Sequence, residues 1–251
     1  MIDGLERVRG WLAASTRIVA LTGAGISTES GIPDFRGPQG VWTKHPKAER
    51  LSNIQHYMSD PEVRALAWQG RLNHPAWTAG PNDGHRALVE LERRGALLAL
   101  VTQNIDGLHQ HAGHASDKVI EVHGTLREVM CMACGERAPM ERALARVRAG
   151  EADPPCRSCG GILKSATISF GQSLEPAVIN RAMRAAERAD LLLAIGSSLQ
   201  VYPIAGAVPL AKAAGARLVI INAEPTPFDD IADAVFRQPI GEILPLLCAR
   251  E

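Results

Sequence analysis

Short apolar runs recur along the chain and alternate with longer stretches in which apolar and polar positions follow a helical period. The runs are rich in Val, Ile and Leu, which is typical of strands buried on both faces of a parallel sheet. They are Ile18–Leu21, Leu97–Val101, Leu191–Ile195 and Leu218–Ile221. The helical stretches are Gly84–Arg94, Pro176–Arg188 and Ile204–Ala214. This alternation predicts an α/β fold built on a Rossmann-like, doubly wound parallel sheet.

Two segments interrupt the alternation and predict a smaller second domain. Residues 41–80 contain three of the four tryptophans and one clear helix, Pro61–Leu72, for which Asp60 is the expected N-cap. Residues 126–165 contain four clustered cysteines and a charged helix near Glu141–Arg148. We therefore expect a helical insertion in the first segment and a zinc-ribbon insertion in the second. The Rossmann-like domain would then consist of residues 1–40, 81–125 and 166–251.

Four of the five cysteines form two C-x-x-C pairs, Cys131 with Cys134 and Cys156 with Cys159, and 21 residues separate the pairs. This spacing is a strong signal for a tetrahedral zinc site with four thiolate ligands. A catalytic zinc keeps one position open for water, so we expect this zinc to be structural. A redox dithiol is the alternative, but it would need only one pair. Cys248 fits a small apolar residue of the last helix.

Length and charge narrow the class of protein. At 251 residues the chain can form one sizeable α/β domain with a small insertion. Lys plus Arg and Asp plus Glu are balanced at 27 each, which argues against binding to nucleic acid or to an anionic membrane. The sequence shows no signal peptide and no stretch that approaches the roughly 20 apolar residues of a membrane span. We expect a cytoplasmic protein.

The first strand is followed by Gly23-Ala24-Gly25, the beginning of a turn that can cradle phosphate. Glycines permit a tight bend there, and backbone N–H groups can approach a pyrophosphate closely. Thr28 stands where a dinucleotide-binding turn has its third glycine. An ordinary strand-to-helix turn is therefore the alternative at this point.

The segment after this turn departs from an ordinary dehydrogenase. Pro33 and Pro38 cannot lie inside a helix, so a helix begun at the turn must end by about Ile32. The loop Asp34-Phe35-Arg36 then places a carboxylate, an aromatic ring and a guanidinium side by side. These residue types suit a loop that covers the nicotinamide half of NAD.

Two further polar clusters directly follow apolar runs. Asn104 and Asp106 come after Leu97–Val101, and His123 comes after Val119–Val122. Groups beyond the carboxyl ends of parallel strands face the ligand crevice of an open sheet, so we expect these side chains to converge there. A helix N-cap or Asx turn is the alternative for the first two, and a structural histidine for the third. Histidine suits proton transfer near neutral pH.

Several short motifs occur in a recognisable order along the chain. They are G-A-G-I-S, G-I-P-D-F-R, T-Q-N-I-D, H-G, the two C-x-x-C pairs, F-G, G-S-S-L and I-N-A-E. In this order they resemble the motifs of the sirtuins, the NAD-dependent protein deacylases. The resemblance covers the chain from Gly23 to Ile240. It implies that NAD is a consumed cosubstrate and that the chain binds one structural zinc ion.

The resemblance also implies a role for each matching residue. The phosphate-binding turn would be Gly23, Ala24, Gly25 and Ser27, and the loop over the reacting ribose would be Asp34, Phe35 and Arg36. Contacts to the nicotinamide and its ribose would come from Gln103, Asn104, Ile105 and Asp106. The distal part of the NAD site would be formed by Gly196, Ser197, Ser198, Asn222, Glu224 and Ile240. The catalytic residues would be Asn104, Asp106 and the general base His123.

The chemistry implied by the resemblance has two stages. The carbonyl oxygen of an acylated lysine attacks C1′ of the nicotinamide ribose, which expels nicotinamide and leaves an imidate bonded to ADP-ribose. His123 then removes a proton from a ribose hydroxyl, so that the 2′ oxygen can attack the imidate carbon. The products are free lysine, nicotinamide and O-acyl-ADP-ribose. Holding both substrates in line turns a poor bimolecular encounter into an oriented one.

The expected partner is an acyl-lysine peptide or protein. By resemblance the peptide would add as a strand between Phe170-Gly171 and the segment around Val201, a mode that gives limited side-chain specificity. Trp68 and Arg71 lie where relatives that prefer succinyl or malonyl lysine have a Tyr-x-x-Arg pair. The arginine is present and the tyrosine is not, so acetyl or a longer acyl chain is the default expectation.

Three other functions can be weighed against deacylation on the same residues. A mono-ADP-ribosyltransferase would use the same ribosyl centre, but His123 favours deacylation because that base acts after nicotinamide leaves. A noncatalytic NAD-binding module that docks through its zinc ribbon would not need Asn104, Asp106 and His123 together. A hydride-transferring dehydrogenase is disfavoured by the missing third glycine and by the proline-interrupted loop.

Overall fold

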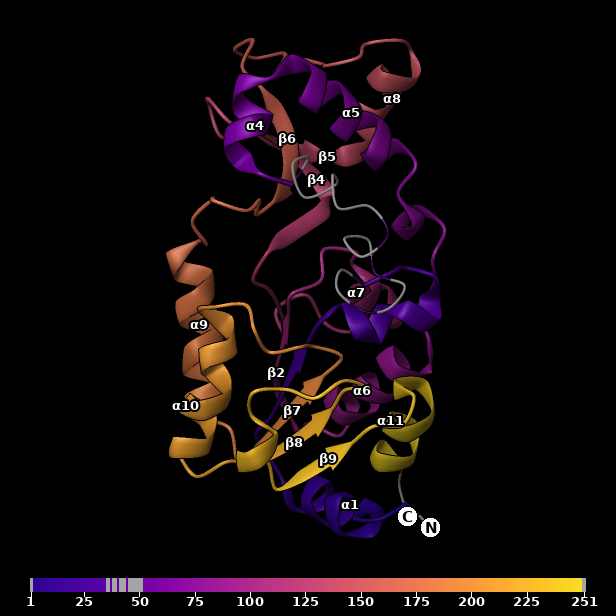
Figure 1. Cartoon of the computed structure of the whole chain (residues 1–251), viewed down its shortest axis with the longest axis vertical. Coiled ribbons are helices and arrows are strands. Elements are labelled where there is room, and N and C mark those ends of the chain that lie inside the picture. The colour runs from indigo at the N-terminus through magenta and orange to yellow at the C-terminus, as the bar shows by residue number, and fades with distance from the viewer. Residues whose placement is uncertain (1, 35–36, 38–39, 41–43, 45–51, 250–251) are drawn as a thin grey trace.

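The computed structural model describes residues 2–34, 37, 40, 44 and 52–249. Phe35 and Arg36, which were expected over the reacting ribose, lie outside the described residues. Figure 1 shows a larger part with a parallel sheet and a smaller part at the opposite end of the long axis.

A six-stranded parallel sheet forms the centre of the larger part, with the strand order β3-β2-β1-β7-β8-β9. Its strands are β1 (Ile18–Thr22), β2 (Leu97–Thr102), β3 (Val119–Glu121), β7 (Leu191–Ile195), β8 (Arg217–Ile221) and β9 (Ala234–Phe236). The four apolar runs predicted as buried strands are therefore confirmed. The order reverses between β1 and β7, which makes this the switch point where open α/β sheets bind ligands.

Helices cover both faces of this sheet (Figure 1). One face packs against α1 (Leu5–Ala14), α6 (Asp83–Arg93) and α11 (Ile240–Cys248), and the other against α9 (Pro176–Glu187) and α10 (Ala207–Ala213). The stretch predicted as one helix from Ile204 to Ala214 begins instead with a 3₁₀ turn, η3 (Ile204–Gly206). Cys248 is buried at the end of α11, as predicted.

The smaller part is built on a three-stranded antiparallel sheet with the order β5-β4-β6. Its elements are β4 (Gly124–Cys131), β5 (Arg137–Pro139), β6 (Leu163–Thr167), α8 (Met140–Arg148), α4 (Ile54–Ser59), α5 (Pro61–Leu72) and η2 (Pro75–Trp77). Asp60 caps α5 by accepting from the backbone N–H groups of Glu62 and Val63, as its position in the sequence predicts. The observed architecture confirms the predicted fold class. The domain boundaries themselves stay a prediction.

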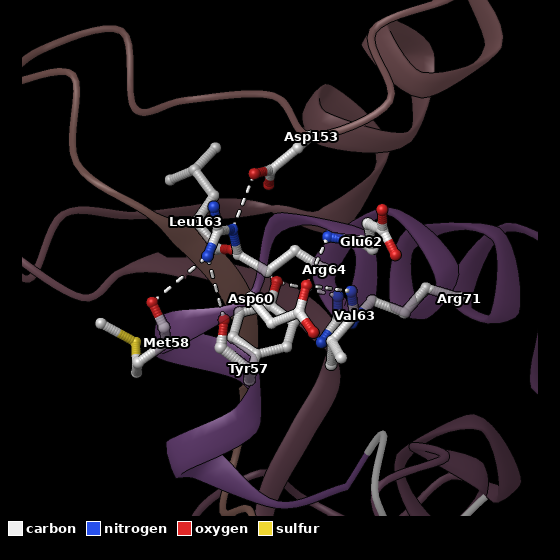
Figure 2. A network of polar contacts seen from close by, with 9 residues as sticks. All are labelled: Tyr57, Met58, Asp60, Glu62, Val63, Arg64, Arg71, Asp153 and Leu163. Carbon is white, nitrogen blue, oxygen red and sulfur yellow. Dashed lines mark hydrogen bonds and ion pairs between the residues drawn. The ribbon is translucent and has the colours of Figure 1, made fainter.

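The helical and cysteine-rich insertions share one hydrophobic core. Trp68 of α5 is fully buried among residues of β4, β6 and α8. Arg64 of α5 joins the two insertions by polar contacts, because its Nε donates to Asp153 Oδ2 at 2.7 Å. Its Nη1 also donates to the carbonyl groups of Tyr57 and Met58 in α4 (Figure 2). Neither insertion has to bury a core alone.

Within the described part of the chain, none of the helices is both long and apolar enough to cross a membrane.

Candidate functional site

The predicted polar clusters meet at the carboxyl edge of the parallel sheet. Gly23 follows β1, Gln103 follows β2, Gly196 follows β7 and Asn222 follows β8. His123 comes two residues after the end of β3. Because all of these strands run in the same direction, their following residues gather at one edge on both sides of the switch point. Several residues at this edge remain partly exposed to solvent, namely Ala24, Gly25, Gln103, Ile105 and Ser198.

The glycines of the first turn are required by the protein's own backbone. The turn continues as the 3₁₀ helix η1 (Ala24–Ser30), which ends at Gly31, before the prolines. A Cβ atom on Gly23 would lie 2.7 Å from the carbonyl oxygen of Gly196, and one on Gly25 would lie 2.7 Å from the Cα of Gly196. Gly196 has φ of +61°, and its own Cβ would lie 2.5 Å from the Ile26 nitrogen. The turns after β1 and β7 therefore pack backbone against backbone.

Asn104 and Asp106 form a buried network with Ser27. Asn104 Nδ2 donates to the carbonyl oxygen of Gly23 at 3.0 Å and to Ser27 Oγ at 3.2 Å. Ser27 Oγ donates to Asp106 Oδ2 at 2.8 Å. Arg127 of β4 donates from Nε and Nη2 to the backbone carbonyl of Asp106. The loop after β2 is thus held both to the first turn and to the smaller part of the molecule.

His123 is oriented by the same loop. Its Nδ1 lies 3.0 Å from the carbonyl oxygen of Gln103. A carbonyl can only accept, so Nδ1 carries the proton and Nε2 of the neutral ring keeps a lone pair. Burial lowers the pKa of His123 below its usual value, and the bond to Gln103 opposes this shift. The arrangement suits a general base, because the ring is neutral and its orientation is fixed.

The distal residues are tied to the same edge. The side chain of Gln103 donates to Ser197 Oγ at 2.8 Å, which links the loops after β2 and β7. Asn222 Nδ2 donates to the backbone carbonyl of Glu224 at 2.8 Å. Ile240 is buried at the first turn of α11. Asp34 Oδ1 accepts from the backbone N–H of Gly37 at 2.9 Å, so this carboxylate helps to shape its own loop.

The segment that is expected to bind the substrate peptide already pairs with another segment of the protein. Phe170 is 42% exposed and forms a parallel bridge with Asn53. Its N–H donates to the carbonyl of Ser52 at 2.9 Å, and its carbonyl accepts from Ile54 at 3.0 Å. Gly171 follows with φ of +80°, and Val201 is half-buried.

Trp68 and Arg71 both belong to α5, in the smaller part of the molecule. Trp68 has no exposed surface, so it is a core residue in this conformation. The guanidinium carbon Cζ of Arg71 lies 4.7 Å from the centroid of the Trp68 ring and 4.9 Å from that of the Tyr57 ring. It donates to Tyr57 Oη at 3.1 Å and to Ser165 Oγ at 3.2 Å. Arg71 therefore connects α4 and α5 to β6, with its charge against two aromatic faces.

The four paired cysteines form a compact cluster with the geometry of a zinc site. Their sulfur atoms all lie within 4.8 Å of one another. Cys131 Sγ is 3.5 Å from Cys159 Sγ, and Cys134 Sγ is 3.9 Å from Cys156 Sγ. Four sulfurs at about 2.3 Å from a central zinc would be about 3.8 Å apart, so the cluster fits one tetrahedral ion. Four protein ligands leave no open position, which makes the zinc structural.

Three buried histidines near the first turn were not predicted from the sequence. The ring centroids of His85 and His109 are 4.9 Å apart, and those of His109 and His114 are 5.8 Å apart. All three are at most 5% exposed. Lys164, a fully buried lysine of β6, was also missed. His109 lies in the T-Q-N-I-D-G-L-H stretch, but nothing in the sequence indicates that it would be buried.

Comparison with known proteins places this geometry in a family. The Sir2 family profile matches residues 23–203. NAD-dependent protein deacetylase 2 of Streptomyces coelicolor is 51% identical over 230 residues, which cover 92% of this chain and 95% of the relative. NAD-dependent protein deacetylase 1 of Pyrobaculum aerophilum is 45% identical over 249 residues, which cover 99% of this chain and 95% of the relative.

Solved structures of Sir2 enzymes resemble this chain. A Sir2 variant with deacetylated p53 peptide and 3′-O-acetyl ADP-ribose has a TM-score of 0.89 and 35% identity, and it covers 97% of this chain and 96% of its own. A Sir2 structure described for mechanism and regulation has a TM-score of 0.88 and 38% identity, with 99% and 97% covered. The chain therefore belongs to the Sir2 family, the sirtuins.

Proposed function

We propose that this chain is an NAD-dependent protein-lysine deacylase, most suited to acetyl-lysine, that transfers the acyl group to ADP-ribose and releases nicotinamide. The single observation that carries the proposal is the placement of His123 beside the loop of Asn104 and Asp106. The ring is neutral, its Nδ1 proton is held by Gln103, and its Nε2 lone pair is left for a substrate proton.

In the first stage the chain orients NAD for attack by the acyl oxygen. Asn104 and Asp106 are assigned to the nicotinamide ribose and the nicotinamide amide, and their burial limits competition from water. Gly23, Ala24, Gly25 and Ser27 are assigned to the phosphates. Backbone N–H groups of a tight turn suit that role.

In the second stage His123 accepts a proton from a ribose hydroxyl, which allows the 2′ oxygen to attack the imidate carbon. Water then adds to this carbon and its bond to the lysine nitrogen breaks, which gives free lysine and O-acyl-ADP-ribose. The proton transfer to His123 favours deacylation over ADP-ribosyl transfer, because deacylation requires a base after nicotinamide has left. Gly196, Ser197, Ser198, Asn222, Glu224 and Ile240 are assigned to the distal part of NAD, and Asp34, Phe35 and Arg36 to the loop over the ribose.

The zinc ion, when bound to the four cysteines, supplies structure and no reactive position. The cysteines fix the end of β4 to the loop that leads into β6, and β6 leads on to Phe170. We assign Phe170, Gly171 and Val201 to the acyl-lysine peptide. The Sir2 structures with acetylated and propionylated peptides support a peptide substrate of this class.

The contacts of Arg71 favour an uncharged acyl group. Its guanidinium already donates to Tyr57 and Ser165, and binding an acyl carboxylate would have to compete with these bonds. Trp68, the second residue considered for this role, is buried beneath Arg71. The cytoplasm stays the predicted compartment, and no binding to nucleic acid or membrane is predicted.

The experiment is product analysis by mass spectrometry with NAD and matched acetyl-, succinyl- and long-chain-acyl-lysine peptides. We expect O-acetyl-ADP-ribose with the acetyl peptide and at least about tenfold less product with the succinyl peptide. Transfer of ADP-ribose to protein, or bound NAD that stays intact with every peptide, would overturn the proposal. Faster reaction with the succinyl peptide would overturn only the acyl assignment.

A further inference from the structure

A series of buried hydrogen bonds runs through Asn104 and Asp106. It begins with Asn104 Nδ2, which donates to Ser27 Oγ, and continues with Ser27 Oγ, which donates to Asp106 Oδ2. Asp106 Oδ1 accepts from the backbone N–H of Leu108 at 2.8 Å. Leu108 is the first residue of α7 (Leu108–Ala112) and is bonded covalently to His109.

From His109 the series of hydrogen bonds leads back to Asn104, where it began. Its Nε2 lies 3.0 Å from Thr22 Oγ1, and Thr22 Oγ1 donates to Thr102 Oγ1 at 2.8 Å. Thr102 Oγ1 accepts from the backbone N–H of Asn104 at 3.1 Å. The bonds therefore form a closed ring, here called the Asn104–His109 ring, through residues 22, 27, 102, 104, 106, 108 and 109.

The direction of the bonds fixes the state of the histidine. The single hydroxyl proton of Thr22 is directed at Thr102, so His109 must donate to Thr22 from Nε2. His109 is thus a neutral imidazole with its proton on Nε2. Burial, together with the neighbouring His85 and His114, holds the pKa of His109 well below its usual value, in agreement with a neutral ring.

The two residues that close the ring cannot meet a substrate themselves. Thr22 is 0% exposed and His109 is 1% exposed. His109 Nδ1 has no hydrogen-bond partner among the described residues, so Nε2 makes the one polar contact found for this imidazole. Breaking a buried bond of this kind leaves a desolvated group without its partner, which favours a single arrangement. Thr22 and His109 can therefore influence the reaction only through the position of the loop that carries Asn104 and Asp106.

We propose that His109 and Thr22 are positioning residues, which hold Asn104 and Asp106 in the orientation that nicotinamide release requires. This inference rests on the proposed function, because that function assigns Asn104 and Asp106 to the nicotinamide and its ribose. A change that opens the ring at either residue lets the loop move relative to the turn after β1. A misplacement of about 1 Å in such a site can slow a reaction by about a hundredfold.

The test compares two pairs of variants with wild type. Thr22→Val removes the hydroxyl at nearly constant volume, whereas Thr22→Ser keeps it. His109→Leu removes the donor, whereas the amide nitrogen of His109→Gln can take the place of Nε2. We expect Thr22→Val and His109→Leu to lower kcat for nicotinamide release by about tenfold to a hundredfold, with little change in KM for the peptide. The serine and glutamine variants should recover to within about fivefold of wild type.

His114→Gln is the matched control. His114 packs against the ring of His109, but its Nδ1 pairs with Glu92 of α6 and contributes no bond to the Asn104–His109 ring. We expect this variant to lower Tm while kcat stays close to wild type. Equal kcat for Thr22→Val and Thr22→Ser, or a loss with His114→Gln as large as that with His109→Leu, would overturn the inference.

The proposed function and the positioning role of His109 and Thr22 can be contradicted independently of each other. Product formation by wild type tests the function, and the ratios between variants test the ring. If wild type forms no product, NAD affinity measured by calorimetry in the same variants decides the second question. Opening the ring should then weaken NAD binding by about tenfold, and unchanged affinity would contradict it.

Discussion

Gly196 illustrates how single residues determine the site. Its φ is +61°, and a side chain there would bring its Cβ to 2.5 Å from the Ile26 nitrogen, so the position has room for glycine alone. Two-glycine turns are common, so the sequence could suggest this turn but could not show that Gly23 and Gly25 face another glycine far away in the chain. The requirement comes from a long-range backbone contact.

Gly196→Ala should destabilise the fold, because the left-handed conformation and the backbone clash act together. We expect a loss of about 3 kcal/mol or more in the free energy of unfolding. Gly10→Ala is the control, since a Cβ on this helical glycine would meet nothing within 4 Å. That change should stabilise the protein by about 0.5–1 kcal/mol. Similar denaturation midpoints for both variants would contradict the assignment.

His123 is also a prediction at the scale of one residue. His123→Ala should keep NAD binding and lose about a hundredfold to ten-thousandfold in turnover. In wild type the base must be neutral, so kcat should fall as pH drops through the pKa of His123. Burial lowers that pKa below 6.5, and the acid limb should have its midpoint below pH 6.5. A midpoint clearly above this value, or near-normal turnover by the variant, would remove His123 from its role.

Among the elements, strands and capped helices could be predicted best. Four buried runs became strands, and Asp60 begins α5, because these features depend on local sequence. The strand β9 was missed because three residues carry too little pattern, and the 3₁₀ start of the helix at Ile204 has no distinct sequence signal. The shared core of the two insertions could not be predicted either, since it joins residues far apart in the sequence, such as Trp68 and Met140.

The contact between α5 and the cysteine-rich segment can be tested at Arg64. Arg64→Ala removes the bond to Asp153 and the donors to two carbonyls of α4, so we expect a loss of about 1–3 kcal/mol in stability. Arg93→Ala is the control, because Arg93 pairs with Glu90 at an exposed helix surface. It should change stability by less than about 0.5 kcal/mol. Equal Tm values for the two variants would show that Arg64 does not join the insertions.

The zinc site can be tested by metal content and structure together. Cys134→Ser should lose the single bound zinc, loosen residues 126–165 in hydrogen exchange, and lower activity indirectly. Cys248→Ala, outside the cluster, should retain one zinc per chain. A Cys134→Ser protein that is free of zinc, stable and fully active would refute the structural role.

At the scale of the whole molecule, the alternation of apolar runs and helical stretches indicated the fold, and the order of motifs indicated the family. The strand order explains why the motifs act together. Segments far apart in sequence follow parallel strands on both sides of the switch between β1 and β7, so they must meet at one edge. The sequence could place Asn104, Asp106 and His123 near one another on this argument. It could not reveal their partners, because Ser27, Thr22 and His109 are brought together only by the packing of η1 and α7 against the sheet.

Nicotinamide release and lysine deacylation should be parts of a single reaction at this edge of the sheet. The most direct measurement is the ratio of nicotinamide, deacetylated peptide and O-acetyl-ADP-ribose formed from NAD and an acetyl-lysine peptide. We expect equal amounts of all three products throughout the reaction. Nicotinamide release without peptide deacetylation, or deacetylation that yields free acetate without NAD consumption, would contradict it.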